Sequence, residues 1–264
     1  MAYLKLRFTV PQVGTDDVYI FYPDGIRLEP TSDGKGVSCG ESGENYKALW
    51  LLHGAGGHSS DWLVNTGLDE YIAGKELIAI CPYAGSSFYV NAYNGVQWGD
   101  VITGELWGKL HKELPISAEP EDNFVAGCSM GGFGAMLLGL AHPDRYGTIG
   151  SLSGGVEIPQ KYVRDEIPFA GAWGFPDSFG PKENVLGGEN DLYALAERRA
   201  HGGGSLPKIY MCCGTRDEHE SETNPRFRDY LRGLGYSVKW SDGDYAHEWT
   251  FWDIELKKFI DFVT

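Results

Sequence analysis

The sequence has no long apolar segment, a shortage of basic residues and no paired-cysteine motif. Its longest apolar runs, such as Ala48 to Leu52, are far shorter than the roughly 18 residues that a membrane-spanning helix needs. Lys and Arg number 22 against 37 Asp and Glu, and the resulting net charge of −15 repels phosphate backbones and anionic lipid surfaces. We therefore expect a protein that binds neither nucleic acid nor membranes.

The cysteines and the N-terminal residues both indicate the cellular compartment in which the protein is expected. The five cysteines form an odd set without CxxC spacing: Cys39, Cys81, Cys128, Cys212 and Cys213. This pattern is typical of small buried side chains in a reducing compartment. Residues 1–10 alternate like a strand and lack the continuous apolar core of a signal peptide. We expect a cytoplasmic protein.

The order of the apolar patterns predicts the fold class. With 264 residues, 42% of them apolar, the chain can build one large core, and we expect a single domain over 1–264. Helical patterns occur at 103–114, 132–141, 224–234 and 252–263. Strand patterns occur at 3–10, 17–23, 46–53, 77–81, 123–126, 148–152, 208–213 and 237–240. This alternation predicts an α/β fold, with a mostly parallel sheet, antiparallel N-terminal strands and helices on both faces.

Two segments interrupt the alternation. Residues 31–44 are rich in Gly and Ser and predict a surface loop. Residues 156–205 contain four prolines, a run of three glycines at 202–204 and several aromatic residues. A long, irregular, aromatic-rich insertion is typical of a lid or cap over a binding site, and a surface insertion without function is the alternative.

The sharpest chemical signal is the G-x-S-x-G motif at Gly127–Gly131. It follows the apolar run 123–126 and begins the helical pattern 132–141, which is the strand–turn–helix setting of a nucleophile elbow. The serine of such a turn sits at a strained backbone position, and bulky neighbours would clash with the strand and the helix. The motif therefore predicts Ser129 as a nucleophile.

A serine hydroxyl needs a base to accept its proton, and in this type of fold the chain order is Ser, acid, His. The histidines well downstream of Ser129 are His201, His219 and His247. We favour His247 as the base, because it follows a polar loop between the last strand and the last helix. We favour Asp217 as the acid, because it follows the strand at 208–213; Glu218 and Glu220 are close alternatives.

The segment His53–Gly57 reads HGAGG and follows a strand predicted to be buried. Small residues there let the backbone present N–H groups to an oxyanion. We therefore expect the amides of Ala55 and Met130 to form the oxyanion hole. A phosphate-binding loop is disfavoured, because the Lys-Ser/Thr of a P-loop is missing. His53 and His58 have no evident third ligand, so we expect no metal and no cofactor.

Aromatic residues supply the candidate substrate contacts. Residues 86–98 and the insertion 156–205 both carry several of them. We take Trp98, Trp173 and Phe133 as candidate substrate-binding residues, with simple packing as the alternative.

These motifs together resemble the esterase D-like branch of the α/β-hydrolases. That branch includes S-formylglutathione hydrolases, tributyrin-type, feruloyl and acetyl-xylan esterases, and mycolyltransferases. The resembling segments span nearly the whole chain: 51–57, 98–106, 127–135, 142–155, 213–218 and 247–253. The ending His247-Glu-Trp-Thr-Phe-Trp-Asp253 and the elbow Ser-Met-Gly-Gly are the most specific pieces.

The resemblance implies the α/β-hydrolase fold, with Ser129, Asp217 and His247 as triad and Ala55 and Met130 as oxyanion donors. The chain is most similar to the tributyrin-type and feruloyl-type carboxylesterases. The S-formylglutathione type usually has Ser-Gly-Leu where this chain has His53-Gly-Ala, and residues 156–205 match no subgroup.

We thus expect a serine carboxylesterase that hydrolyses short-chain acyl or aromatic esters of the feruloyl or acetyl type. A thioesterase of the S-formylglutathione hydrolase type, or an acyltransferase, is the alternative with the same triad. The expected partner is a small-molecule ester, and self-association into a homo-oligomer is left open.

Overall fold

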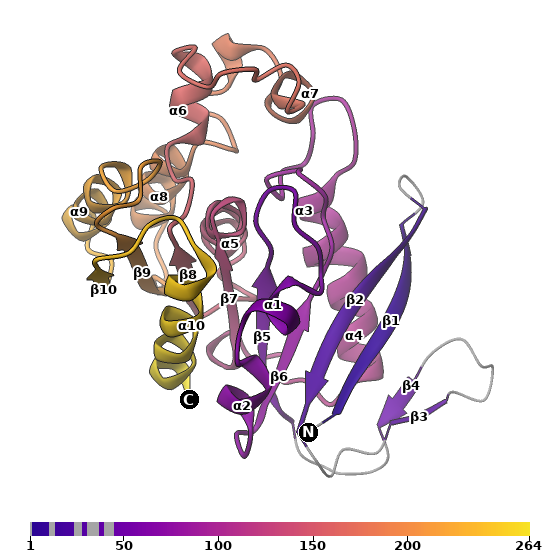
Figure 1. Cartoon of the computed structure of the whole chain (residues 1–264). Helices are drawn as coiled ribbons and strands as arrows, with labels where there is room; N and C mark the ends of the chain where they lie inside the picture. The colour runs from indigo at the N-terminus through magenta and orange to yellow at the C-terminus, as the bar shows by residue number, and fades with distance from the viewer. Residues whose placement is uncertain (1, 11–13, 24–27, 31–36, 40–44) are drawn as a thin grey trace.

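A sheet of eight strands runs through the centre of the molecule (Figure 1). The computed structural model describes residues 2–10, 14–23, 28–30, 37–39 and 45–264. In sheet order the strands are β1 (Ala2–Val10), β2 (Gly14–Tyr22), β6 (Leu77–Cys81), β5 (Lys47–Leu52), β7 (Asn123–Cys128), β8 (Thr148–Leu152), β9 (Lys208–Gly214) and β10 (Val238–Gly243). All pairs from β6 to β10 are parallel, whereas β1–β2 and β2–β6 are antiparallel. The predicted sheet, with its antiparallel start, is confirmed.

Helices cover both faces of this sheet, and β5 shows why. Its Trp50 side chain packs into one core, and its neighbours Leu49 and Leu51 pack into the other, so no face of the strand meets water. The first core takes apolar side chains from α4 (Trp107–Glu113), α5 (Met130–Ala141), α8 (Leu192–His201) and α9 (Thr223–Gly233). The second takes them from α1 (Asp61–Asn65), α2 (Leu68–Ile72) and α10 (Trp249–Val263). This arrangement is the predicted α/β-hydrolase architecture.

The N-terminal region departs in part from the predicted loop over 31–44. Within it, β4 (Val37–Cys39) pairs with β3 (Leu28–Pro30) in a separate two-stranded sheet. The rest of the predicted loop lies outside the described residues. Cys81, Cys128, Cys212 and Cys213 are buried free thiols, as expected from the sequence.

The insertion 156–205 is more regular than its composition predicted. It contains α6 (Ile158–Val163), α7 (Phe175–Phe179), a 3₁₀ turn at Lys182–Asn184 and the ten-residue helix α8. Helix α8 forms because the Asp191 carboxylate accepts a hydrogen bond from the Tyr193 N–H, which caps its first turn, and because its apolar face packs against α5. Figure 1 shows α6 and α7 standing above the sheet as a cap.

Two further differences lie in the helices before β7. The short helices α1 and α2 between β5 and β6 were not predicted. The helix predicted at 103–114 begins earlier, as α3 (Trp98–Asp100), and runs through a π-helical turn at Val101–Leu106 into α4. Among the described residues, no helix has the length and apolar character to cross a lipid bilayer.

Candidate active site

Ser129 occupies the sharp turn between β7 and α5. Its backbone has φ 55° and ψ −118°, a strained conformation for a residue with a side chain. The turn is possible only because its neighbours are glycines. A Cβ on Gly131 would lie 2.2 Å from the carbonyl oxygen of Leu52, and a Cβ on Gly127 would lie 2.5 Å from the backbone of Gly131. The glycines of the motif thus have the steric function inferred from the sequence.

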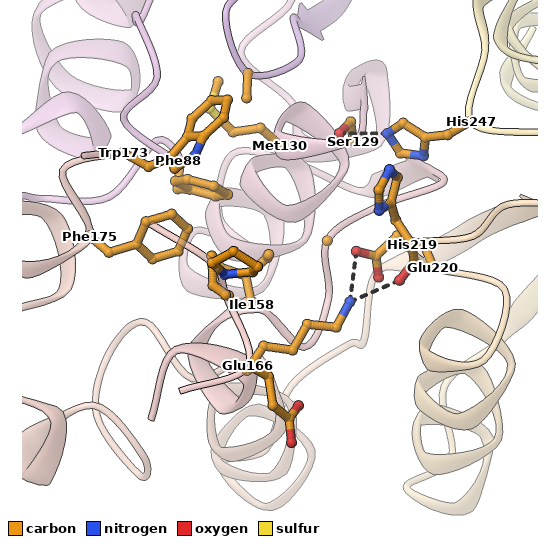
Figure 2. Close-up of a pocket in the computed structure, with 15 residues that line it drawn as sticks. Phe88, Ser129, Met130, Ile158, Glu166, Trp173, Phe175, His219, Glu220 and His247 are labelled. Atoms are coloured by element: carbon orange, nitrogen blue, oxygen red, sulfur yellow. Dashed lines mark hydrogen bonds and ion pairs between the residues drawn. The ribbon is translucent and has the colours of Figure 1, made fainter. Parts of the chain in front are cut away.

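His247 lies in the loop between β10 and α10, and its ring reaches Ser129. The distance from His247 Nε2 to Ser129 Oγ is 2.9 Å (Figure 2). The other ring nitrogen, Nδ1, is 2.8 Å from Oδ2 of Asp217, in the loop after β9. These three side chains come from three different loops of the parallel sheet and form a continuous chain of hydrogen bonds.

Asp217 is fully buried and held on both carboxylate oxygens. Oδ1 accepts hydrogen bonds from the backbone N–H groups of His219 and Glu220, at 3.0 and 3.1 Å. Burial alone would raise the pKa of Asp217. The hydrogen bond and charge of His247 and the two backbone donors outweigh burial and lower the pKa. The carboxylate therefore stays ionised and keeps Nδ1 of the imidazole protonated, which leaves Nε2 free to accept the serine proton.

The loop His53–Gly57 lies against Ser129, and contacts from residues 84–89 hold its shape. His53 is buried, its Nδ1 lies 2.8 Å from the Gly54 carbonyl oxygen, and its Nε2 accepts the Ala84 N–H at 3.1 Å. Since Nε2 accepts, Nδ1 carries the proton. The Tyr89 hydroxyl donates to the His53 carbonyl at 2.9 Å. Burial lowers the pKa of His53, so its ring stays neutral.

Sequence reasoning missed these supporting contacts of Ala84 and Tyr89, because they join segments more than thirty residues apart. The only sequence signal was the aromatic content of residues 86–98.

A cavity of about 380 Å³ opens beside Ser129, between the sheet edge and the cap. Ser129, His247, Ala55 and Met130 line its base. Its remaining wall is apolar on one side and polar on the other, and comprises Phe88, Gly155, Ile158, Lys161, Glu166, Ile167, Pro168, Trp173, Phe175, His219 and Glu220 (Figure 2).

Only one of the three aromatic residues predicted to bind substrate lies at the cavity. Trp173 lines the cavity and is 54% exposed. Phe133 and Trp98 do not line it, so their expected substrate contact is corrected. Phe133 lies on the buried face of α5, where its ring packs behind that of Phe88, with centroids 5.9 Å apart. Trp98 is buried against Tyr83, with centroids 6.2 Å apart.

A second cavity of about 290 Å³ reaches Ser129 from another side. It shares Ala55, Ser129 and His247 with the first, and is otherwise lined by Gly54, Gly57, Asp61, Cys128, Glu248, Trp249 and Trp252. Ser129 is thus accessible from two cavities. Within the described part of the chain, no three His, Cys, Asp or Glu side chains are grouped so that they could hold a metal ion.

Known proteins share both the sequence pattern and this fold. A family model described as putative esterase matches residues 37–259. An acetyl esterase of Caldicellulosiruptor saccharolyticus is 30% identical over 217 residues, which cover 80% of each chain.

Two solved structures from Staphylococcus aureus are similar over 99% of this chain and 98% of theirs, each at 26% identity. One is the fluorophosphonate-binding serine hydrolase FphF with substrate bound, with a TM-score of 0.84. The other is the S-formylglutathione hydrolase FrmB, with a TM-score of 0.83. The chain belongs to the esterase family that this model describes, and it is an esterase with the α/β-hydrolase fold.

Proposed function

We propose that this enzyme is a serine carboxylesterase that hydrolyses short-chain acyl or aromatic esters of the acetyl or feruloyl type. The observation that carries the proposal is the chain of hydrogen bonds from Ser129 through His247 to the buried Asp217, which begins at the floor of a largely apolar cavity. A nucleophile, a base and an orienting acid in this order are the groups that acyl transfer needs.

In the proposed first half-reaction, Ser129 Oγ attacks the ester carbonyl carbon while His247 Nε2 accepts its proton. The amides of Ala55 and Met130 stabilise the resulting oxyanion. His247 then donates the proton to the leaving alcohol oxygen, the carbon–oxygen bond of the ester breaks, and an acyl-serine remains. Asp217 stabilises the imidazolium formed in between.

In the second half-reaction, a water molecule takes the place of the alcohol. His247 removes a proton from this water as its oxygen bonds to the acyl carbon, and then returns the proton to Ser129 Oγ as the acid leaves. Trp173 and the other apolar residues of the cavity wall exclude bulk water and contact the substrate.

The test is hydrolysis of p-nitrophenyl esters from acetate to decanoate, together with methyl ferulate. We expect turnover of short-chain or aromatic esters, with a lower kcat/KM for the longest acyl chains. A protein whose fold is verified by circular dichroism and that hydrolyses none of these esters would contradict the proposal.

A thioesterase activity is the second candidate, favoured by the similarity to FrmB over almost the whole chain. The same assay with S-formylglutathione separates the two, since a thioesterase would prefer this substrate over every oxygen ester. Addition of an alcohol acceptor, with detection of a new ester product, tests the acyltransferase alternative.

A further inference from the structure

His219 lines the cavity but has no role in the mechanism proposed above. It lies two residues after Asp217 in the loop that follows β9, and its side chain is exposed. Its ring stands perpendicular to that of His247, with centroids 5.4 Å apart and an interplanar angle of 87° (Figure 2). Among the described residues, neither nitrogen of the His219 ring has a hydrogen-bond partner.

The backbone of His219, in contrast, is held on both sides. Its N–H donates to Oδ1 of Asp217 at 3.0 Å, and its carbonyl oxygen accepts from Nζ of Lys161 at 2.9 Å. Lys161 also forms an ion pair with the buried carboxylate of Glu220, at 3.1 Å. The His219 ring is therefore free, whereas its backbone is held by Asp217 of the triad and by Lys161 of the cap helix α6. Binding a substrate group therefore has to order only the side-chain torsions of His219 and not its backbone.

The mechanism determines which half of the substrate lies near this ring. His247 Nε2 donates its proton to the leaving oxygen, so the alcohol half of the ester lies beside His247. Where this half extends into the first cavity, it meets His219, whose ring packs against that of His247. The apolar wall with Phe88, Trp173 and Phe175 forms the other side of the cavity.

The charges near His219 favour a neutral polar partner. Lys161 and Glu220 neutralise one another in their ion pair, and Glu166 is paired with Arg164 at 2.7 Å. This wall therefore offers no unpaired charge to an ionic group. A neutral imidazole carries one donor and one acceptor nitrogen, a pattern that matches a hydroxyl group, which both accepts and donates.

We propose that His219 is a specificity-determining residue that forms a hydrogen bond with a hydroxyl group on the alcohol half of the ester, close to the ester oxygen. The inference rests on the proposed esterase function. It assigns a preference for hydroxylated leaving groups to a side chain outside the catalytic triad.

The test compares two esters of the same acyl group, the 2-hydroxyethyl ester and the propyl ester, which differ by a hydroxyl in place of a methyl. The measured quantity is the ratio of their kcat/KM values in the wild type and in His219→Phe, so that the intrinsic reactivity of each ester cancels. Phe keeps an aromatic ring beside His247 and removes both nitrogens. We expect the ratio to fall roughly 5- to 10-fold, the size of one neutral hydrogen bond.

Two further variants serve as controls for this comparison. His219→Gln again supplies a donor and an acceptor, and should recover part of the preference for the hydroxyl. His201→Phe makes the same substitution at an exposed position of α8 away from the cavity, and should keep the wild-type ratio. An unchanged ratio in His219→Phe would overturn the proposal. An equal loss on both esters would overturn it as well, because it indicates a general packing role beside His247. The acyl group is the one preferred among the p-nitrophenyl esters. A wild type that is active on those esters but hydrolyses neither alkyl ester overturns this proposal, whereas inactivity on every ester contradicts the esterase function itself.

Discussion

At the scale of single residues, the Asp217 carboxylate determines which nitrogen of His247 is protonated. In Asp217→Asn the side-chain oxygen can still accept the backbone N–H of His219 or Glu220, and its amide nitrogen then faces Nδ1 of His247. Nδ1 must now accept, so the proton moves to Nε2 and the ring can no longer take the serine proton. We predict that kcat falls about 10³- to 10⁴-fold while the protein stays folded.

Steady-state hydrolysis of the preferred p-nitrophenyl ester measures this loss. Asp191→Asn is the matched control, since Asp191 caps α8 and asparagine caps helices about equally well. Its activity should stay close to that of the wild type. A similar activity in Asp217→Asn and in the wild type would exclude Asp217 as the orienting acid.

Sequence reasoning at this scale is strongest where a residue type has a fixed place in a motif. The sharp turn at Ser129 and the need for its glycines could be predicted because the steric demands of the turn are local. His219 was weighed only as an alternative base, and the packing of Phe133 behind Phe88 was missed. Both depend on contacts between distant segments, which a single sequence does not reveal.

At the scale of elements, the central strands were the most predictable. β5, β6 and β7 are apolar runs of strand length, because both faces of a central parallel strand are buried. The helices of the cap were harder to predict. α6 and α7 have six and five residues and begin next to prolines, so they are too short to show a periodic pattern. α8 was missed because the prolines and glycines around it dominate the composition of the insertion.

At the scale of the whole molecule, one buried and two half-buried histidines link stability to pH. Burial lowers the pKa of His53, and burial is also the main cause of the lowered pKa of His111 and His142. The unfolded chain, with ordinary histidines, binds more protons than the folded protein below about pH 6.5. Stability is therefore fully present above this pH and decreases as the pH falls further, by at most about 1.4 kcal/mol per histidine for each pH unit.

We predict that the melting temperature falls between pH 7.5 and pH 5.5, a window above the range in which ordinary carboxylates titrate. Thermal unfolding followed by circular dichroism tests this, with His53→Gln as the comparison. The variant loses one titrating group, so its melting temperature should depend less steeply on pH. Equal slopes in both proteins would show that His53 is not kept neutral by the fold.

Because β7, β8, β9 and β10 are parallel, the loops that follow β7, β9 and β10 lie at the same edge of the sheet. The central claim is that the side chains of these three loops make Ser129 a nucleophile. Reaction with a fluorophosphonate probe, followed by peptide mass spectrometry, tests it most directly. The account predicts one phosphonyl group per chain, on the peptide that contains Ser129, with no labelling and no ester hydrolysis in Ser129→Ala. Labelling at another residue, or ester hydrolysis by Ser129→Ala at the wild-type rate, would contradict it.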